Sequence, residues 1–138
     1  AFVLGGHGND MVPVRSYTNV AGIPIEAMLP KDKIEAIEKR VRGAGGEVVA
    51  LLKTGSAFVS PAAACIEMAE SFLKDQKKVL PCAALCKGEY GINNLYIGVP
   101  VIIGSSGIEK IIEIELNDQE KEELKVSVAG VQSLVDVL

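Results

Sequence analysis

The sequence has neither an excess of basic residues nor a long apolar run. Its 138 residues include 14 Lys and Arg against 18 Asp and Glu, which gives a formal net charge of -4. Surfaces that bind nucleic acid or anionic membranes are basic, so the composition argues against both partners. No apolar stretch reaches the ~20 residues that cross a bilayer, and the chain does not open with the basic region of a signal peptide. We therefore expect a cytoplasmic protein.

Cysteine is scarce and histidine scarcer still. The three cysteines, Cys65, Cys82 and Cys86, are an odd number in apolar surroundings, which favours reduced, buried thiols over a disulfide framework. A zinc site needs four ligands, so one distant histidine and one more cysteine would have to complete the pair Cys82 and Cys86. We expect no metal.

Several motifs of common enzyme classes are missing. The chain has no P-loop, and no G-x-S-x-G of a nucleophile elbow. Gly43-Ala44-Gly45-Gly46 lacks the G-x-G-x-x-G spacing and follows an expected helix rather than a strand. Carboxylates fall mostly on helix faces and one exposed strand face, so no glycosidase pair is marked. The chain therefore shows no dinucleotide site of its own.

The first half of the chain is expected to pass from short strands into helices. Segments 11–14 and 17–20 are typical of extended structure. Spacing predicts a helix over 32–42, which the glycines of segment 43–46 should bend or interrupt before 47–52 resumes it. Ser60 and Pro61 then predict a helix start, with Ser60 as the cap. The helix over 62–73 is apolar around most of its circumference and should be buried on more than one side.

The second half favours antiparallel strands and a terminal helix. We expect strands at 79–85 and 95–99, a break or edge at Pro100, a hairpin turn at 104–107 and a strict-alternation strand at 112–116. Asn117 and Glu120 resemble a capping box. The face of the terminal helix consists of Leu124, Val128, Val131, Val135 and Leu138. Together these elements predict one compact α+β domain over residues 1–138.

His7, the chain's only histidine, lies directly behind a short apolar run and between glycines. Imidazole titrates near neutral pH and is well suited to moving a proton in catalysis. Flanking glycines would let a substrate approach the ring closely. On the local pattern alone, a turn that happens to contain a histidine is the simpler interpretation. Gly55 and Ser56 likewise fit either a loop that holds a small polar ligand or a plain helix-to-helix connection.

An ordered series of segments along the chain favours the functional interpretation of His7, Gly55 and Ser56. They are VLGGHG at 3–8, MVP at 11–13, VAGIP at 20–24, KTGSA at 53–57, PAAA at 61–64, MAES at 68–71, LPCA at 80–83, GEYG at 88–91 and GVP at 98–100. The series resembles the C-terminal, substrate-binding domain of malate dehydrogenases of the lactate-dehydrogenase-like type, in the lactate/malate dehydrogenase family. The likeness runs from the first residue nearly to the last.

The resemblance implies a function for the candidate residues. His7 would be the proton donor and acceptor in the interconversion of L-malate and oxaloacetate, with NAD as hydride carrier. Ser56 and Gly55 would lie in the loop near the 2-hydroxy or 2-keto acid substrate. The family's NAD-binding domain, its substrate-clamping arginines and the aspartate partner of the histidine would belong to sequence that this chain lacks. We therefore expect a fragment of a larger protein, inactive alone, whose parent is a homo-dimer or tetramer.

The chain departs from the family pattern at two places. Asn9 stands where the family usually has an aspartate, and the basic residue Arg15 is one position early, which puts a functional role for Arg15 in doubt. Two alternatives stay open. One is an L-lactate dehydrogenase of the same family, because substrate choice is set largely in the absent half. The other is a non-catalytic oligomerisation domain.

Overall fold

The computed structural model describes residues 1–137, and these form two compact units. The first comprises Ala1–Ala44 and Ile114–Leu138, and the second comprises Gly45–Glu113. Strands pair only in antiparallel fashion in the described part of the chain, alongside three α-helices. The α+β class is therefore confirmed, whereas the single compact domain stays a prediction.

The first unit begins with two short antiparallel pairs. β1 (Phe2–Leu4) pairs with β2 (Val12–Val14), with Leu4 opposite Val12. Leu4, Val12 and Val14 are fully buried, so this pair forms the apolar centre of the unit. β3 (Asn19–Val20) and β4 (Ile23–Pro24) form a small exposed hairpin. Both predicted extended segments are thus present, except that Tyr17 belongs to a 3-10 turn, Arg15–Tyr17.

Helix α3 (Asp118–Val135) is anchored at its first turn by a buried carboxylate. The predicted capping box is confirmed: the Asn117 side chain accepts from the Glu120 amide at 2.9 Å, and Glu120 Oε2 accepts from the Asn117 amide at 3.0 Å. Glu120 is 4% exposed and also accepts from Ser16, at 2.9 Å from the amide and 2.7 Å from the hydroxyl. One side chain therefore closes the helix start and joins it to the turn after β2.

The predicted apolar face of α3 is only partly buried. Leu124 is buried and Val128 and Val131 are half-buried, but Val135 is exposed. Leu138 lies outside the described residues. The buried stripe includes a polar residue that the apolar pattern passes over, Ser127.

Helix α1 (Lys31–Leu52) runs without interruption through the glycines of segment 43–46. Glycine costs a helix interior roughly 1 kcal/mol relative to alanine without removing a backbone donor or acceptor, so helical hydrogen bonding continues past it. Of the predicted apolar face, Ile34 is buried while Ile37 and Val41 are exposed.

The second unit contains helix α2 (Val59–Leu73). The structure corrects two predictions made for this helix. Ser60 is not the cap, because the helix already begins at Val59 and Phe58 occupies the cap position without a side-chain hydrogen bond. Ser71 is the one buried residue of α2, donating to the Ile103 carbonyl at 2.7 Å. The expectation of burial on several sides is wrong for this chain, as Ile66 at 62% exposure illustrates.

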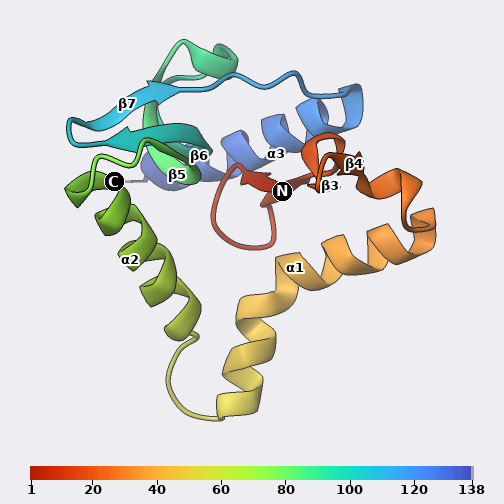
Figure 1. Cartoon of the computed structure of the whole chain (residues 1–138). Helices are drawn as coiled ribbons and strands as arrows, with labels where there is room; N and C mark the ends of the chain where they lie inside the picture. Colours follow the sequence, from red (N-terminus) through yellow and green to blue (C-terminus); the bar gives the residue numbers. More distant parts are fainter. Residues whose placement is uncertain (138) are drawn as a thin grey trace. The chain divides into compact units, whose positions relative to one another are not determined.

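The same unit contains a three-stranded antiparallel sheet in the order β5-β6-β7, visible with β6 in the middle in Figure 1. β5 spans Lys78–Lys87, β6 spans Asn93–Gly104 and β7 spans Gly107–Ile111. The hairpin turn predicted at 104–107 joins β6 to β7. Residues 112–116 lie outside the ladder, so the strand predicted there is wrong, although burial still alternates along the segment.

Pro100 neither breaks nor borders the sheet, contrary to the prediction. It lies within the central strand β6, opposite Pro81 of β5, and the ladder to β7 ends next to it, at Val101 opposite Ile111. The Ile112 amide donates to the Pro100 carbonyl at 2.8 Å. Proline cannot return that bond, and the Tyr90 hydroxyl donates to the Ile112 carbonyl instead, at 2.8 Å. A side chain thus supplies the hydrogen bond that the proline cannot make.

Two of the three cysteines are buried and one is exposed. Cys82 and Cys86 are buried on one face of β5, where burial raises the pKa of both thiols. Cys65 is exposed on α2, so the expectation of burial is wrong for it. Among residues 1–137, no helix combines the length and apolarity that a membrane crossing needs.

The Tyr90 hydroxyl leads to a stability prediction. Tyr90→Phe removes the donor to the Ile112 carbonyl and should lower the free energy of unfolding by about 1 kcal/mol. The matched control is Tyr96→Phe, because the Tyr96 ring is 65% exposed and its hydroxyl has no partner in the described chain. Urea unfolding measures both.

A double-mutant cycle assigns that loss to the proline. In a Pro100→Ala background the alanine amide can donate to Ile112, so Tyr90→Phe should cost less than in the parent. An equal cost in both backgrounds would contradict the substitution of a tyrosine donor for the proline amide.

Candidate functional site

His7 lies in the loop Gly5–Met11 that joins β1 to β2, drawn in red in Figure 1. Its side chain is exposed. Within residues 1–137 the imidazole has no hydrogen-bond or ion-pair partner. The ring is therefore accessible to a ligand, and its own nitrogens are not used to hold the fold.

The backbone leading into His7 is seated directly on α3. The Gly6 amide donates to Ser127 Oγ at 2.8 Å, across 121 residues of sequence. A Cβ on Gly5 would collide with the Ser127 side chain, and a Cβ on Gly6 would lie 2.9 Å from Val131 Cγ2. Gly5 also has a φ of +89°, which L side chains rarely adopt. Glycine is required here by the approach of the helix and, at Gly5, by the backbone as well.

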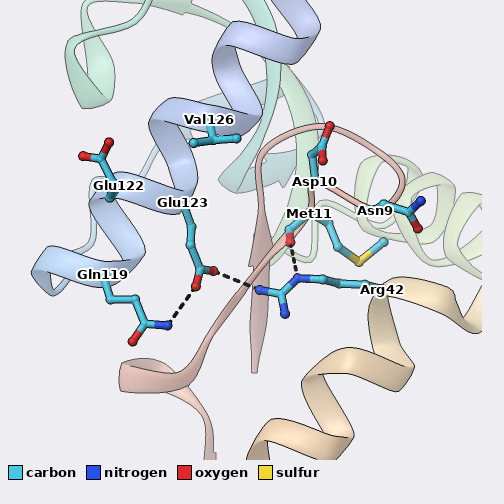
Figure 2. Close-up of a pocket in the computed structure, with 8 residues that line it drawn as sticks. All are labelled: Asn9, Asp10, Met11, Arg42, Gln119, Glu122, Glu123 and Val126. Carbon is cyan, nitrogen blue, oxygen red and sulfur yellow. Dashed lines mark hydrogen bonds and ion pairs between the residues drawn. The ribbon is translucent and has the colours of Figure 1, made fainter.

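The backbone leaving His7 is held by a turn and by α1. The Met11 amide donates to the Gly8 carbonyl at 3.2 Å. Arg42 of α1 donates from Nε to the Met11 carbonyl at 3.1 Å and from its terminal nitrogen to Glu123 of α3 at 2.9 Å. Figure 2 shows Arg42 reaching both groups. Both ends of the loop are thus restrained.

A pocket of about 360 Å³ lies beside this loop. Its lining residues are Asn9, Asp10, Met11, Arg42, Gln119, Glu122, Glu123 and Val126 (Figure 2). Arg42 is already neutralised by Glu123, so among the described residues the pocket offers no unpaired cation for an acidic substrate. His7 is not among the lining residues, and we assign the pocket no part in the chemistry.

Arg15 serves the structure of the first unit. Its guanidinium makes two parallel hydrogen bonds to Glu38 of α1, both at 2.8 Å. The hydrogen bond to Glu38 raises the pKa of Arg15. Paired in this way, Arg15 is not free to bind a substrate carboxylate.

Gly55 and Ser56 lie in the exposed connection between α1 and α2, in the second unit. Gly55 has a φ of +89°, and the Phe58 amide donates to the Ser56 carbonyl at 2.9 Å. The Ser56 hydroxyl has no partner in the described residues. The two predicted binding residues and His7 therefore belong to different units, and their joint role stays a prediction.

Sequence reasoning missed the two residues that hold the His7 loop. Ser127 has a detectable signal, since it lies at helical spacing between the apolar residues Leu124 and Val131. Arg42 has none, because its partners, the Met11 carbonyl and Glu123, are 31 and 81 residues away.

Similarity to known proteins identifies the family of this chain. The family model for the lactate/malate dehydrogenase alpha/beta C-terminal domain matches residues 1–136. The chain belongs to the lactate/malate dehydrogenase family. The resemblance inferred from its motifs is thereby confirmed, and so is the corresponding fold.

The chain is also similar to individual members of the lactate/malate dehydrogenase family, in sequence and in structure. The chain is 56% identical over 135 residues to malate dehydrogenase 1 of Anaeromyxobacter dehalogenans, covering 98% of this chain and 43% of that protein. The malate dehydrogenase of Picrophilus torridus matches with a TM-score of 0.94 at 50% identity, over 99% of this chain and 44% of that one. A lactate dehydrogenase of Cryptosporidium parvum, complexed with lactic acid and nicotinamide adenine dinucleotide, matches with a TM-score of 0.95 at 41% identity, over 98% and 44%. The chain spans less than half the length of these relatives.

The described residues do not fit a dinucleotide such as the one in that complex. Dinucleotides are held by a parallel sheet, with their pyrophosphate at the start of a helix. Here the sheets are antiparallel, and the glycines of segment 43–46 lie inside α1 rather than at its start. In the described part of this chain we therefore assign no residue to the cofactor.

The close packing of the His7 loop against α3 predicts how much stability is lost when a glycine of the loop is replaced by alanine. Gly5→Ala should destabilise the protein more than Gly8→Ala, by about 1–3 kcal/mol in the free energy of unfolding. Both glycines have positive φ, +89° and +134°, but only Gly5 would place its Cβ against Ser127, whereas nothing lies within 4 Å at Gly8. Urea unfolding measures the difference, and equal losses would contradict the close seating on α3.

Proposed function

We propose that this chain is the C-terminal domain of an NAD-dependent malate dehydrogenase, with His7 as the proton donor and acceptor. Membership of the family supports the proposal, together with the 56% identity to proteins named malate dehydrogenase. The observation that carries the role of His7 is its exposed, unpartnered imidazole on a loop restrained at both ends.

The chemistry assigns a defined task to this imidazole. Oxidising an alcohol to a ketone removes a hydride from carbon and a proton from oxygen. Neutral imidazole at His7 accepts the hydroxyl proton of L-malate, and the imidazolium returns it to the carbonyl oxygen of oxaloacetate. Hydride transfer is the chemistry that NAD supplies when bound, and we assign its binding to a part of the enzyme outside this chain. Ser56, with its unpartnered hydroxyl, and Gly55 would contact the substrate.

L-lactate dehydrogenase is the second candidate within the family. The match to the Cryptosporidium parvum lactate dehydrogenase, at 41% identity, supports it less strongly than the 56% matches support malate. Malate carries a second carboxylate that an arginine must neutralise. Comparing kcat/KM for L-malate and L-lactate in the enzyme that contains this chain separates the two, and we expect malate to be preferred.

Replacing His7 tests the proton-transfer role. In the enzyme that contains this chain, His7→Gln should lower kcat by about 10²–10⁴-fold, because the hydroxyl proton loses its acceptor. The unfolding midpoint should hardly change, since the ring is exposed and has no partner to lose. Steady-state kinetics and thermal unfolding provide the two measurements.

A surface change on α3 is the control for His7→Gln. Lys121 is exposed, and its one ion pair within residues 1–137, to Asp118, is long at 3.8 Å. Lys121→Gln should therefore keep the parent kcat. If His7→Gln also keeps it, proton transfer by His7 is refuted and the non-catalytic oligomerisation domain becomes the better interpretation.

The 138-residue chain alone should be inactive. Without a site for the hydride carrier, L-malate and NAD added to the purified chain should give no turnover above the background rate. The assay follows reduced nicotinamide by its absorbance. Turnover approaching that of a complete malate dehydrogenase would show that these residues hold the cofactor after all.

A further inference from the structure

Ser127 is a buried polar residue that the proposed reaction does not use. It is 1% exposed, on the face of α3 that carries Leu124 and Val131. Its Oγ accepts a hydrogen bond from the Gly6 amide at 2.8 Å. Gly6 immediately precedes His7, so this contact lies one residue from the candidate proton donor.

We propose that Ser127 is a positioning residue for His7. By holding the Gly6 amide, it sets the direction in which the backbone enters His7 and hence where the imidazole points. This inference rests on the proposed role of His7 in proton transfer. Ser127 acts only through the backbone, because a side chain buried to this degree cannot touch the substrate.

The composition of the loop explains why such a restraint is needed. Gly5, Gly6 and Gly8 leave the chain on both sides of His7 free to adopt many backbone conformations. After His7, the turn from Gly8 to Met11 and the Arg42 hydrogen bond limit that freedom. In the part of the loop that precedes His7, only one hydrogen bond to a side chain is present in the described chain, the one from the Gly6 amide to Ser127.

Glycine at both preceding positions makes the contact possible. A Cβ at Gly5 would strike Ser127, and one at Gly6 would lie 2.9 Å from Val131 Cγ2. The helix therefore touches backbone rather than side chains, and a hydroxyl as short as that of Ser127 reaches the amide. Gly5, Gly6 and Ser127 therefore act together: the two glycines let α3 approach the backbone, and the serine accepts its hydrogen bond.

The size of the expected effect follows from geometry. Misplacing a catalytic group by about 1 Å can cost about 10²-fold in rate. Ser127→Ala leaves the Gly6 amide without its acceptor but retains the packing, so kcat should fall by about tenfold or more. KM for the substrate should change little, because no substrate contact is lost.

Ser71 provides a matched control for a purely structural effect. It is equally buried, at 0% exposed, and its hydroxyl also binds backbone, donating to the Ile103 carbonyl at 2.7 Å and accepting from the Lys78 amide at 3.2 Å. Ser71→Ala should destabilise the enzyme to a similar extent. It should leave kcat unchanged, because its partners are in the sheet.

The experiment compares kcat, KM and the unfolding midpoint of the parent enzyme and of the Ser127→Ala and Ser71→Ala variants, with His7→Gln as the inactive reference. The ring C2 proton of His7, assigned by its loss from the nuclear magnetic resonance spectrum of His7→Gln, should shift in Ser127→Ala alone. If Ser127→Ala does not fold, Ser127→Cys replaces it, since sulfur is a weak acceptor of similar position.

The outcomes separate this inference from the proposed function. A fall in kcat confined to the Ser127 variant supports the positioning role. An unchanged kcat, or equal falls in both serine variants, overturns it while His7→Gln stays inactive. If His7→Gln retains its activity, the proton-transfer role and the positioning role are refuted together.

Discussion

The contact between α3 and the bare backbone at Gly5 and Gly6 is the constraint on which the first unit depends. It joins the beginning of the chain to a helix 121 residues later, through one hydrogen bond to Ser127 and two absent Cβ atoms. Glu120 ties the start of the same helix to the turn after β2. The helix is thus held at two points along its buried face. The backbone that carries the exposed His7 imidazole is thereby restrained, although the loop around it is rich in glycine.

Sequence reasoning succeeded at two places where the cause of the structure is local. The capping box at Asn117 and the hairpin turn at 104–107 depend on residues within three positions of one another, so their patterns could be read directly. Pro100 was misjudged because its tolerance depends on a hydroxyl from Tyr90, a residue outside the strand. The apolar circumference of α2 likewise indicates surface that water disfavours, but periodicity cannot specify what, if anything, covers it.

The candidate site shows the same division. His7 was found because a single histidine between glycines is conspicuous, while its role came from a resemblance spread over the whole chain and confirmed at the level of the family. Ser127 and Arg42 were missed because each matters through a backbone atom far away in sequence. No spacing rule reports a contact of that kind. Arg15 shows the converse, since a charge of doubtful function proved to be engaged by Glu38.

Pro81 determines what the outer edge of β5 can accept. Directly opposed residues in antiparallel strands point their backbone groups either toward each other or both away. The Pro100 carbonyl is used toward Ile112, so the backbone of Pro81, its opposite residue, faces the open edge of the sheet. There the pyrrolidine ring of Pro81 presents no donor, within a strand of 10 residues. A strand of another molecule pairing with this edge would lack one backbone hydrogen-bond donor at Pro81. The proline therefore disfavours edge-to-edge aggregation.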